Sequence, residues 1–188
     1  MDASEMRAWI QAASWIAAII GGAFAIYKVM HEVHQGRQQR TDELRWRKAE
    51  AAKALNDQML DDPPTHAALI MLDWDGREFE VAPQQKAHIT RKEMLTALRT
   101  TNTSNFSTKE MFIRDSFDNL FYYMGVIEHY IGRSLVEFED VQHPIDYYVG
   151  KLAENRDVFE GYLGRYGFVK GSAFLERFPA WRGSRRTA

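Results

Sequence analysis

The segment Ala8–Tyr27, AWIQAASWIAAIIGGAFAIY, decides how the chain is interpreted, because its 20 residues include no charged side chain. A helix of that length spans about 30 Å at a rise of about 1.5 Å per residue, which matches the hydrocarbon core of a bilayer. Trp9 and Tyr27, followed by Lys28, suit the two membrane interfaces. The segment therefore predicts a transmembrane helix, with residues 1–30 as a membrane anchor.

Two alternatives to an uncleaved anchor are a signal peptide and a buried core helix. The N-terminal sequence MDASEMR is not basic, and the apolar run is longer than the core of a usual signal peptide, so the anchor is favoured. Residues 28–47 carry five Lys or Arg side chains, whereas the N-terminal flank carries one. Because positive flanks stay in the cytoplasm, we expect a single-pass protein of a bacterial inner membrane with its N-terminus outside and its C-terminal domain cytoplasmic.

Small residues recur along the same segment in two neighbouring ridges. The first ridge contains Ala13, Ala17, Gly21 and Ala25, and the second contains Ser14, Ala18 and Gly22. Small ridges let helix backbones approach closely in lipid, so they predict a homo-oligomer. Two ridges favour contact with two neighbours and hence a ring, although such spacing also arises by chance in an alanine-rich anchor.

The remaining 158 residues divide by composition. Residues 31–62 predict a charged stalk helix, and the sequence DDPP at 61–64 ends it. Residues 63–181 contain most of the aromatic side chains and predict a helical domain, and residues 182–188 form a basic tail. The expected fold class is all-α, with one N-terminal transmembrane helix followed by a cytoplasmic helical-bundle domain.

Local signals place the helices of this domain. Thr65, Thr90 and Ser107 are expected to cap the first three helices, the third running to about residue 131, and Ser134 with Glu137 offers a further capping box. Residues 77–81 alternate polar and apolar side chains, but one such piece is too isolated to form a sheet. The sequence also predicts helices over residues 143–153, 157–166 and 172–178.

The sequence holds no recognisable catalytic or ligand-binding motif. It contains no cysteine, no glycine-rich phosphate loop and no GxSxG or HExxH motif, so we expect no enzyme activity, no cofactor and no metal. His31 and His34 share a helix face and are interpreted as solvated. No histidine follows an arginine at the spacing of the HEPN ribonuclease motif, and the net charge of −2 argues against direct nucleic-acid binding. The tyrosine pairs at 122–123 and 147–148 and the series of Phe and Tyr residues up to Phe168 predict a core or a protein-facing patch.

The layout as a whole ends in Pro179-Ala180-Trp181 and resembles small bacterial single-pass membrane proteins associated with anti-phage defence. It is similar in layout to the membrane-pore accessory protein of RNA-targeting CRISPR systems. The resemblance implies an oligomeric effector that permeabilises or depolarises the inner membrane, with the lipid bilayer, copies of itself and a defence-system protein as partners. The alternative is a membrane-tethered protein-binding or scaffold module without pore activity.

Overall fold

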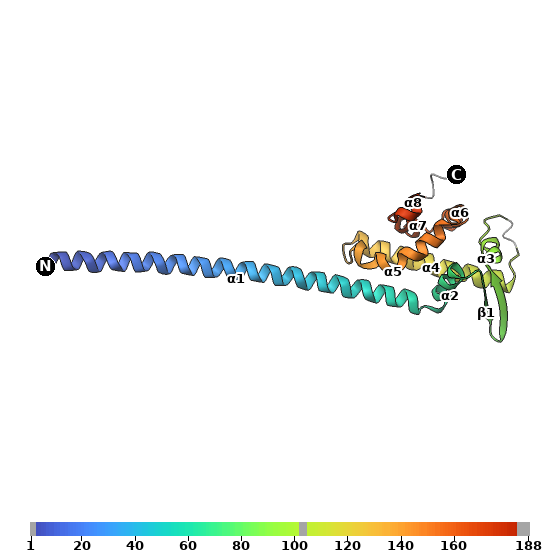
Figure 1. Ribbon diagram of the computed structural model, residues 1–188, viewed down its shortest axis with the longest axis horizontal. Helices are drawn as coiled ribbons and strands as arrows, with labels where there is room; N and C mark the ends of the chain where they lie inside the picture. The colour runs from blue at the N-terminus through green and yellow to red at the C-terminus, as the bar shows by residue number, and fades with distance from the viewer. Residues whose placement is uncertain (1–2, 102–104, 184–188) are drawn as a thin grey trace. The chain divides into compact units, whose positions relative to one another are not determined.

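The computed structural model describes residues 3–101 and 105–183, and within the first helix it describes the side chains of Trp15, Gly22 and residues 27–61. These residues form eight helices and one two-stranded hairpin (Figure 1). The chain divides into two compact units, residues 1–47 and residues 48–188.

The first helix, α1, runs without a break over Ala3–Asp61, so residues 8–27 are not a separate element. Among the side chains that the structure describes, no helix combines the length and the apolar content that crossing a bilayer requires. The predicted transmembrane anchor is therefore wrong, and so are the single-pass inner-membrane placement and the membrane and pore classification that depended on it. The prediction rested on the lack of charge over residues 8–27, but nine of these 20 residues are alanine or glycine, which carry little apolar surface.

The expectation of an all-α fold is also wrong, because strands β1 (Gly76–Ala82) and β2 (Gln85–Thr90) pair antiparallel. The turn between them is Pro83-Gln84, and Gln84 adopts a positive φ of 64°. Two-residue hairpin turns are usually signalled by Asn-Gly or a similar pair, and this sequence lacks one. The sequence therefore contains no turn signal that would indicate a second strand able to pair with residues 77–81.

Helix α2 (Pro63–Asp73) is capped by Asp62, three residues before the predicted cap Thr65, which lies within the helix. Its prolines occupy the first helical positions, where a missing backbone N–H costs nothing. The Asp62 carboxylate accepts the backbone N–H of Thr65 at 3.0 Å and so caps the helix. The Asp-Pro-Pro sequence therefore ends α1 and starts α2 at once.

The predicted cap at Thr90 and the predicted capping box at Ser107 are confirmed, whereas the box predicted at Ser134 and Glu137 is wrong, because Glu137 itself precedes the next helix and makes no side-chain cap hydrogen bond. Thr90 caps α3 (Arg91–Ala97) and Ser107 caps α4 (Thr108–Gly132), each with a glutamate at the third helical position. These signals are reliable because both partners lie within one helical turn.

The C-terminal helices are predicted less uniformly. Helix α6 (Arg156–Tyr166) begins one residue before its predicted start. Helix α5 (Phe138–Ala153) begins five residues early and contains Pro144, and α7 (Val169–Leu175) begins three residues early. A final short helix, α8 (Pro179–Gly183), follows.

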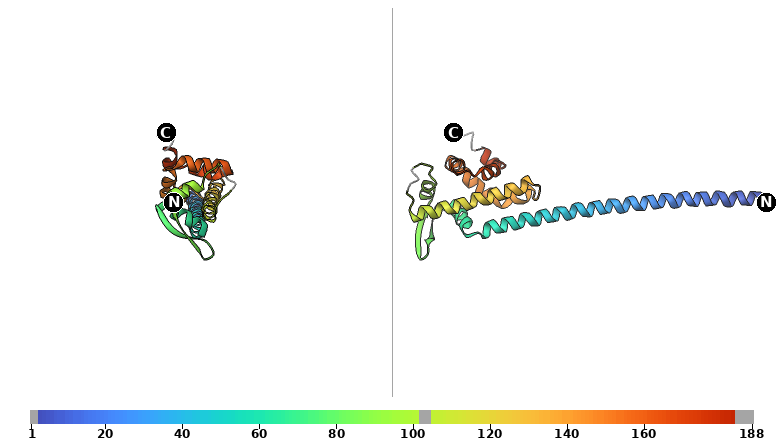
Figure 2. Two further views of the ribbon diagram at one scale, coloured as in Figure 1. Left: turned by 90° about the vertical axis from the view of Figure 1, so that its right-hand side faces the viewer. Right: turned by 180° about the vertical axis from the view of Figure 1, so that it is seen from behind.

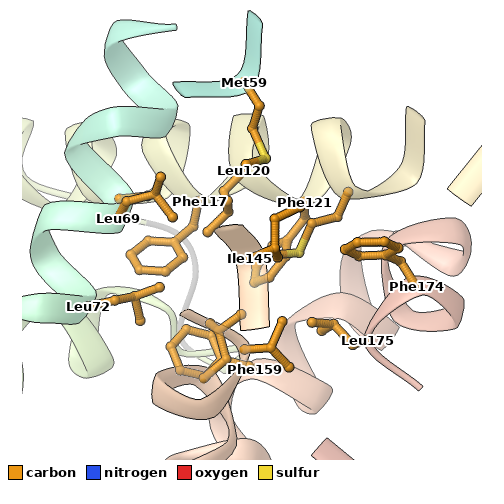
Figure 3. Packing of buried hydrophobic residues seen from close by; sticks show 14 of the residues in the cluster. Met59, Leu69, Leu72, Phe117, Leu120, Phe121, Ile145, Phe159, Phe174 and Leu175 are labelled. Atoms are coloured by element: carbon orange, nitrogen blue, oxygen red, sulfur yellow. The ribbon is translucent and has the colours of Figure 1, made fainter. Parts of the chain in front are cut away.

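Helix α4 lies at the centre of the second unit and packs against α2, α3 and α7, while the hairpin lies at the end where α4 begins (Figure 2). The rings of Phe117, Phe121 and Phe159 contact one another at centroid distances of 5.5–6.3 Å (Figure 3). All three side chains are fully buried, whereas Tyr122 and Tyr147 of the two tyrosine pairs are more than half exposed and do not belong to the core. The α1 residues Ala52, Leu55 and Met59 are buried in the same cluster.

The buried guanidinium of Arg156 holds the last helix, α8, against the core. Arg156 is 5% exposed, and it donates to the Glu176 carboxylate at 2.9 Å and to the Trp181 carbonyl. Its guanidinium also lies 4.5 Å from the centroid of the Trp181 ring, which is itself buried. Trp181 thereby closes the C-terminal side of the core.

Candidate functional site: an apolar groove between α4 and α7

One surface groove combines a substantial volume with an almost entirely apolar lining. It encloses about 510 Å³ between the middle of α4 and the segment that joins α6 to α7. The lining residues are Phe121, Tyr122, Gly125, Val126, His129, Tyr130, Gly167, Phe168, Val169, Lys170 and Gly171. A concave apolar surface with few polar groups is the usual form of a binding site.

The floor of the groove is aromatic and fixed from behind. The ring of Phe168 lies 5.8 Å from that of Phe121 and stacks on that of Tyr162 at 6.4 Å, with 12° between the planes. Phe121 and Tyr162 are fully buried. The floor is therefore part of the packed core and does not need a ligand to form.

Glycines set the distance between the two walls. A Cβ at Gly171 would lie 2.9 Å from the Phe121 carbonyl oxygen, so only glycine lets α7 approach α4 this closely. A Cβ at Gly125 would lie 3.4 Å from the Lys170 Cβ. Gly167 turns the chain between α6 and α7 with φ of 76°, a conformation that favours glycine.

The rims of the groove are exposed apolar side chains. Val169 is 76% exposed and Tyr122 is 61% exposed, one on each wall. Exposure of a single apolar side chain is ordinary, but these two flank an apolar floor. Together they extend the groove into a surface that a partner could cover.

The polar groups of the groove gather on Lys170 and His129, whose Nζ and Nδ1 atoms lie 3.1 Å apart. None of the lining residues is acidic. Glu128, which precedes His129 on α4, accepts two hydrogen bonds from Arg177 at 2.6 and 2.8 Å. The polar end of the groove is therefore basic.

A second polar cluster lies behind the floor. Tyr162 donates to Asp118 at 2.7 Å, and burial raises the pKa of that carboxyl above its ordinary value. Arg114 lies against Tyr162 and donates to the Ala97 carbonyl at 2.9 Å, where it satisfies the end of α3. The cluster connects α3, α4 and α6, and we assign it a structural role.

The residues proposed from sequence do not meet at this groove. The side chains of Ala13, Ala17, Gly21, Ala25, Ser14, Ala18 and Trp9 lie outside those that the structure describes. A Cβ at Gly22 would meet nothing within 4 Å. Tyr27 is exposed and stacks on His31 at 6.1 Å, and Lys28 pairs with Glu32 at 3.9 Å.

Within the described residues, no group of three or more His, Cys, Asp or Glu side chains is arranged to hold a metal ion. The absence of cofactors and of enzyme activity stays a prediction. Of the groove, only Tyr122 and the aromatic series ending at Phe168 were noticed from sequence, as a core or a protein-facing patch. Gly167 and Gly171 flank residues 168–170 in the sequence, and this spacing of glycines is the further signal that could have located the second wall.

The chain matches no protein-family model, no curated protein and no solved structure. The resemblance in layout to defence-associated proteins therefore stays a sequence-based expectation.

Proposed function

We propose that this protein is a protein-binding module, and that the groove between α4 and α7 receives an amphipathic helical segment of another protein. The observation that supports it is the preformed apolar groove with Tyr122 and Val169 exposed on its rims. Helices bind such grooves by inserting apolar side chains that recur every three or four residues. The proposal keeps the scaffold reading of the sequence and omits the membrane tether.

A helical segment suits this groove better than a small molecule does. Sites for small molecules bury roughly 70–90% of the ligand surface. Here the rim side chains are 76% and 61% exposed, so the groove is continuous with the open surface. A partner that covers both rims would bury them together with the floor, and buried aromatic contacts contribute most to protein association.

Site-specific photocrosslinking tests this proposal. A photoreactive phenylalanine analogue replaces Tyr122 in the groove, or Tyr147 on α5 as the control, since both tyrosines are more than half exposed. We expect a discrete crosslinked protein from position 122 and none from position 147. Val169→Asp should abolish the product without unfolding the protein, because an acidic residue is favourable in the first turn of a helix.

The result can also contradict the proposal directly. Equal products from positions 122 and 147, or a product that Val169→Asp leaves unchanged, would show that the groove does not select a partner. The absence of any product from position 122 in cells would likewise count against a protein-binding role.

Exposed apolar side chains on α1 favour a second candidate, association with copies of this chain. Each is at least half exposed: Tyr27, Val29, Met30, Val33, Leu44 and Trp46. Sedimentation of the full chain should then show an oligomer that Met30→Glu with Val33→Glu dissociates. Gln38→Glu with Gln39→Glu adds the same charge without removing apolar surface and should leave the oligomer intact. A monomer at all concentrations would exclude this candidate.

A further inference from the structure

We propose that the segment bound in the groove carries a carboxylate that pairs with Lys170. This inference rests on the proposed function and specifies the chemistry of the partner. It follows from the positive charge at the polar end of the groove and from the ion pair that the neighbouring Glu128 already forms with Arg177.

Lys170 is exposed, and within residues 3–101 and 105–183 the polar contact of its ammonium is with the His129 ring nitrogen at 3.1 Å. The imidazole ring carries no negative charge in either of its protonation states, so this contact does not cancel the charge of the ammonium. The cation therefore remains available to an anionic group.

The carboxylate that precedes His129 on α4 is already paired. Glu128 accepts two hydrogen bonds from Arg177. Arg133, the C-cap residue of α4, follows His129 by four positions and is exposed. The local charge is thus positive, although the whole chain carries a net charge of −2.

Because binding removes water from Lys170, this local charge determines which partner segments the groove favours. A partner that covers Val169 and Phe168 also removes water from the adjacent Lys170, and an ammonium that loses water without gaining a partner raises the free energy of the complex. A carboxylate on the partner compensates that loss, whereas a cation there adds repulsion. The groove should therefore favour apolar helices that carry Asp or Glu beside their apolar face.

A displayed library of helical peptides tests the inference on the full-length protein. The library fixes leucines at positions i, i+3, i+4 and i+7 and randomises the residues that flank this apolar face. Val169→Asn, which removes apolar surface without changing the charge, identifies the peptides that use the groove, because they are lost on this variant. We expect Asp and Glu to be enriched among them, and a Glu→Gln change in one such peptide should weaken binding about tenfold.

Reversal of the charge supplies the decisive comparison. Selection on Lys170→Glu should enrich Lys and Arg at the same flanking positions, whereas Lys86→Glu on the hairpin should select acidic peptides as the unaltered protein does. Groove-dependent peptides without acidic enrichment, or an unchanged selection on Lys170→Glu, would overturn the inference and leave the binding function standing. If no peptide depends on Val169, the proposed function itself fails.

Discussion

Gly171 is the residue at which α7 approaches α4 most closely, and it has no room for a side chain. A Cβ there would lie 2.9 Å from the Phe121 carbonyl oxygen, which belongs to helical backbone and cannot rotate away. We expect Gly171→Ala to lower the free energy of unfolding by about 1–3 kcal/mol, as overpacking does elsewhere. Urea denaturation measures the change.

Gly164→Ala is the matched control, since a Cβ at this position of α6 meets nothing within 4 Å. It should raise stability by up to about 1 kcal/mol, because alanine is the better helix former. Equal effects of the two substitutions would refute the close contact between α4 and α7.

Arg156 is the second residue whose substitution is expected to lower the free energy of unfolding strongly. Its guanidinium holds Glu176 and the Trp181 carbonyl from a buried position, so Arg156→Ala leaves those groups without their cation. We expect a loss of about 3 kcal/mol in the free energy of unfolding. Lys86→Ala, which breaks an exposed pair with Glu78 at 3.9 Å, should change stability very little. A similar small effect at Arg156 would argue against its anchoring role.

The ionisation of Glu93 makes the stability of the folded protein depend on pH. The Lys109 ammonium, together with the backbone N–H and hydroxyl of Thr90, lowers the pKa of Glu93 to about 2 in the folded protein from an ordinary value of 4.5. Since the folded pKa is depressed, the stabilisation is complete above about pH 4.5 and is lost as the pH falls towards 2.

Glu93→Gln keeps the capping-box geometry but removes the charge. The variant should therefore be less stable than the unaltered protein at pH 6, and the difference should shrink towards pH 2. Urea titrations at several pH values measure it. A stability difference that stays constant over this range would show that the charge of Glu93 contributes nothing.

At the scale of elements, the hairpin is the least expected part of the fold and has a strained turn. Gln84 adopts φ of 64°, which costs a non-glycine residue free energy. Gln84→Gly should stabilise the protein by about 1 kcal/mol in thermal unfolding. Gln85→Gly, one residue later within β2, should instead destabilise it, and stabilisation by both would show that the turn is not the cause.

The elements that could be predicted from sequence are those whose signals are local. The boxes at Thr90 and Ser107 specify their helices because cap and glutamate lie within one turn. The strand over residues 85–90 depends on pairing with β1, and the early start of α5 has no side-chain cap to mark it. The groove depends on α4 and α7 meeting, and their contact joins residues about 45 positions apart, a separation at which sequence pattern carries no signal.

At the scale of the molecule, the division after Arg47 predicts which part of α1 the second unit needs. Removal of residues 1–47 should leave the thermal midpoint of the second unit nearly unchanged. Removal of residues 1–60 should lower it strongly, because Ala52, Leu55 and Met59 are core residues. Circular dichroism of both truncated chains checks this, and equal midpoints would show that α1 adds nothing to the core.

The buried position of Trp181 has a consequence for biosynthesis. A ribosome adds residues from the N-terminus onward, and Trp181 is made after all the other side chains of the aromatic core. Until it emerges, the buried cluster lacks one of its aromatic side chains, and the nascent chain exposes apolar surface of the kind that chaperones bind. Folding of the second unit should therefore be completed only when translation has passed this tryptophan.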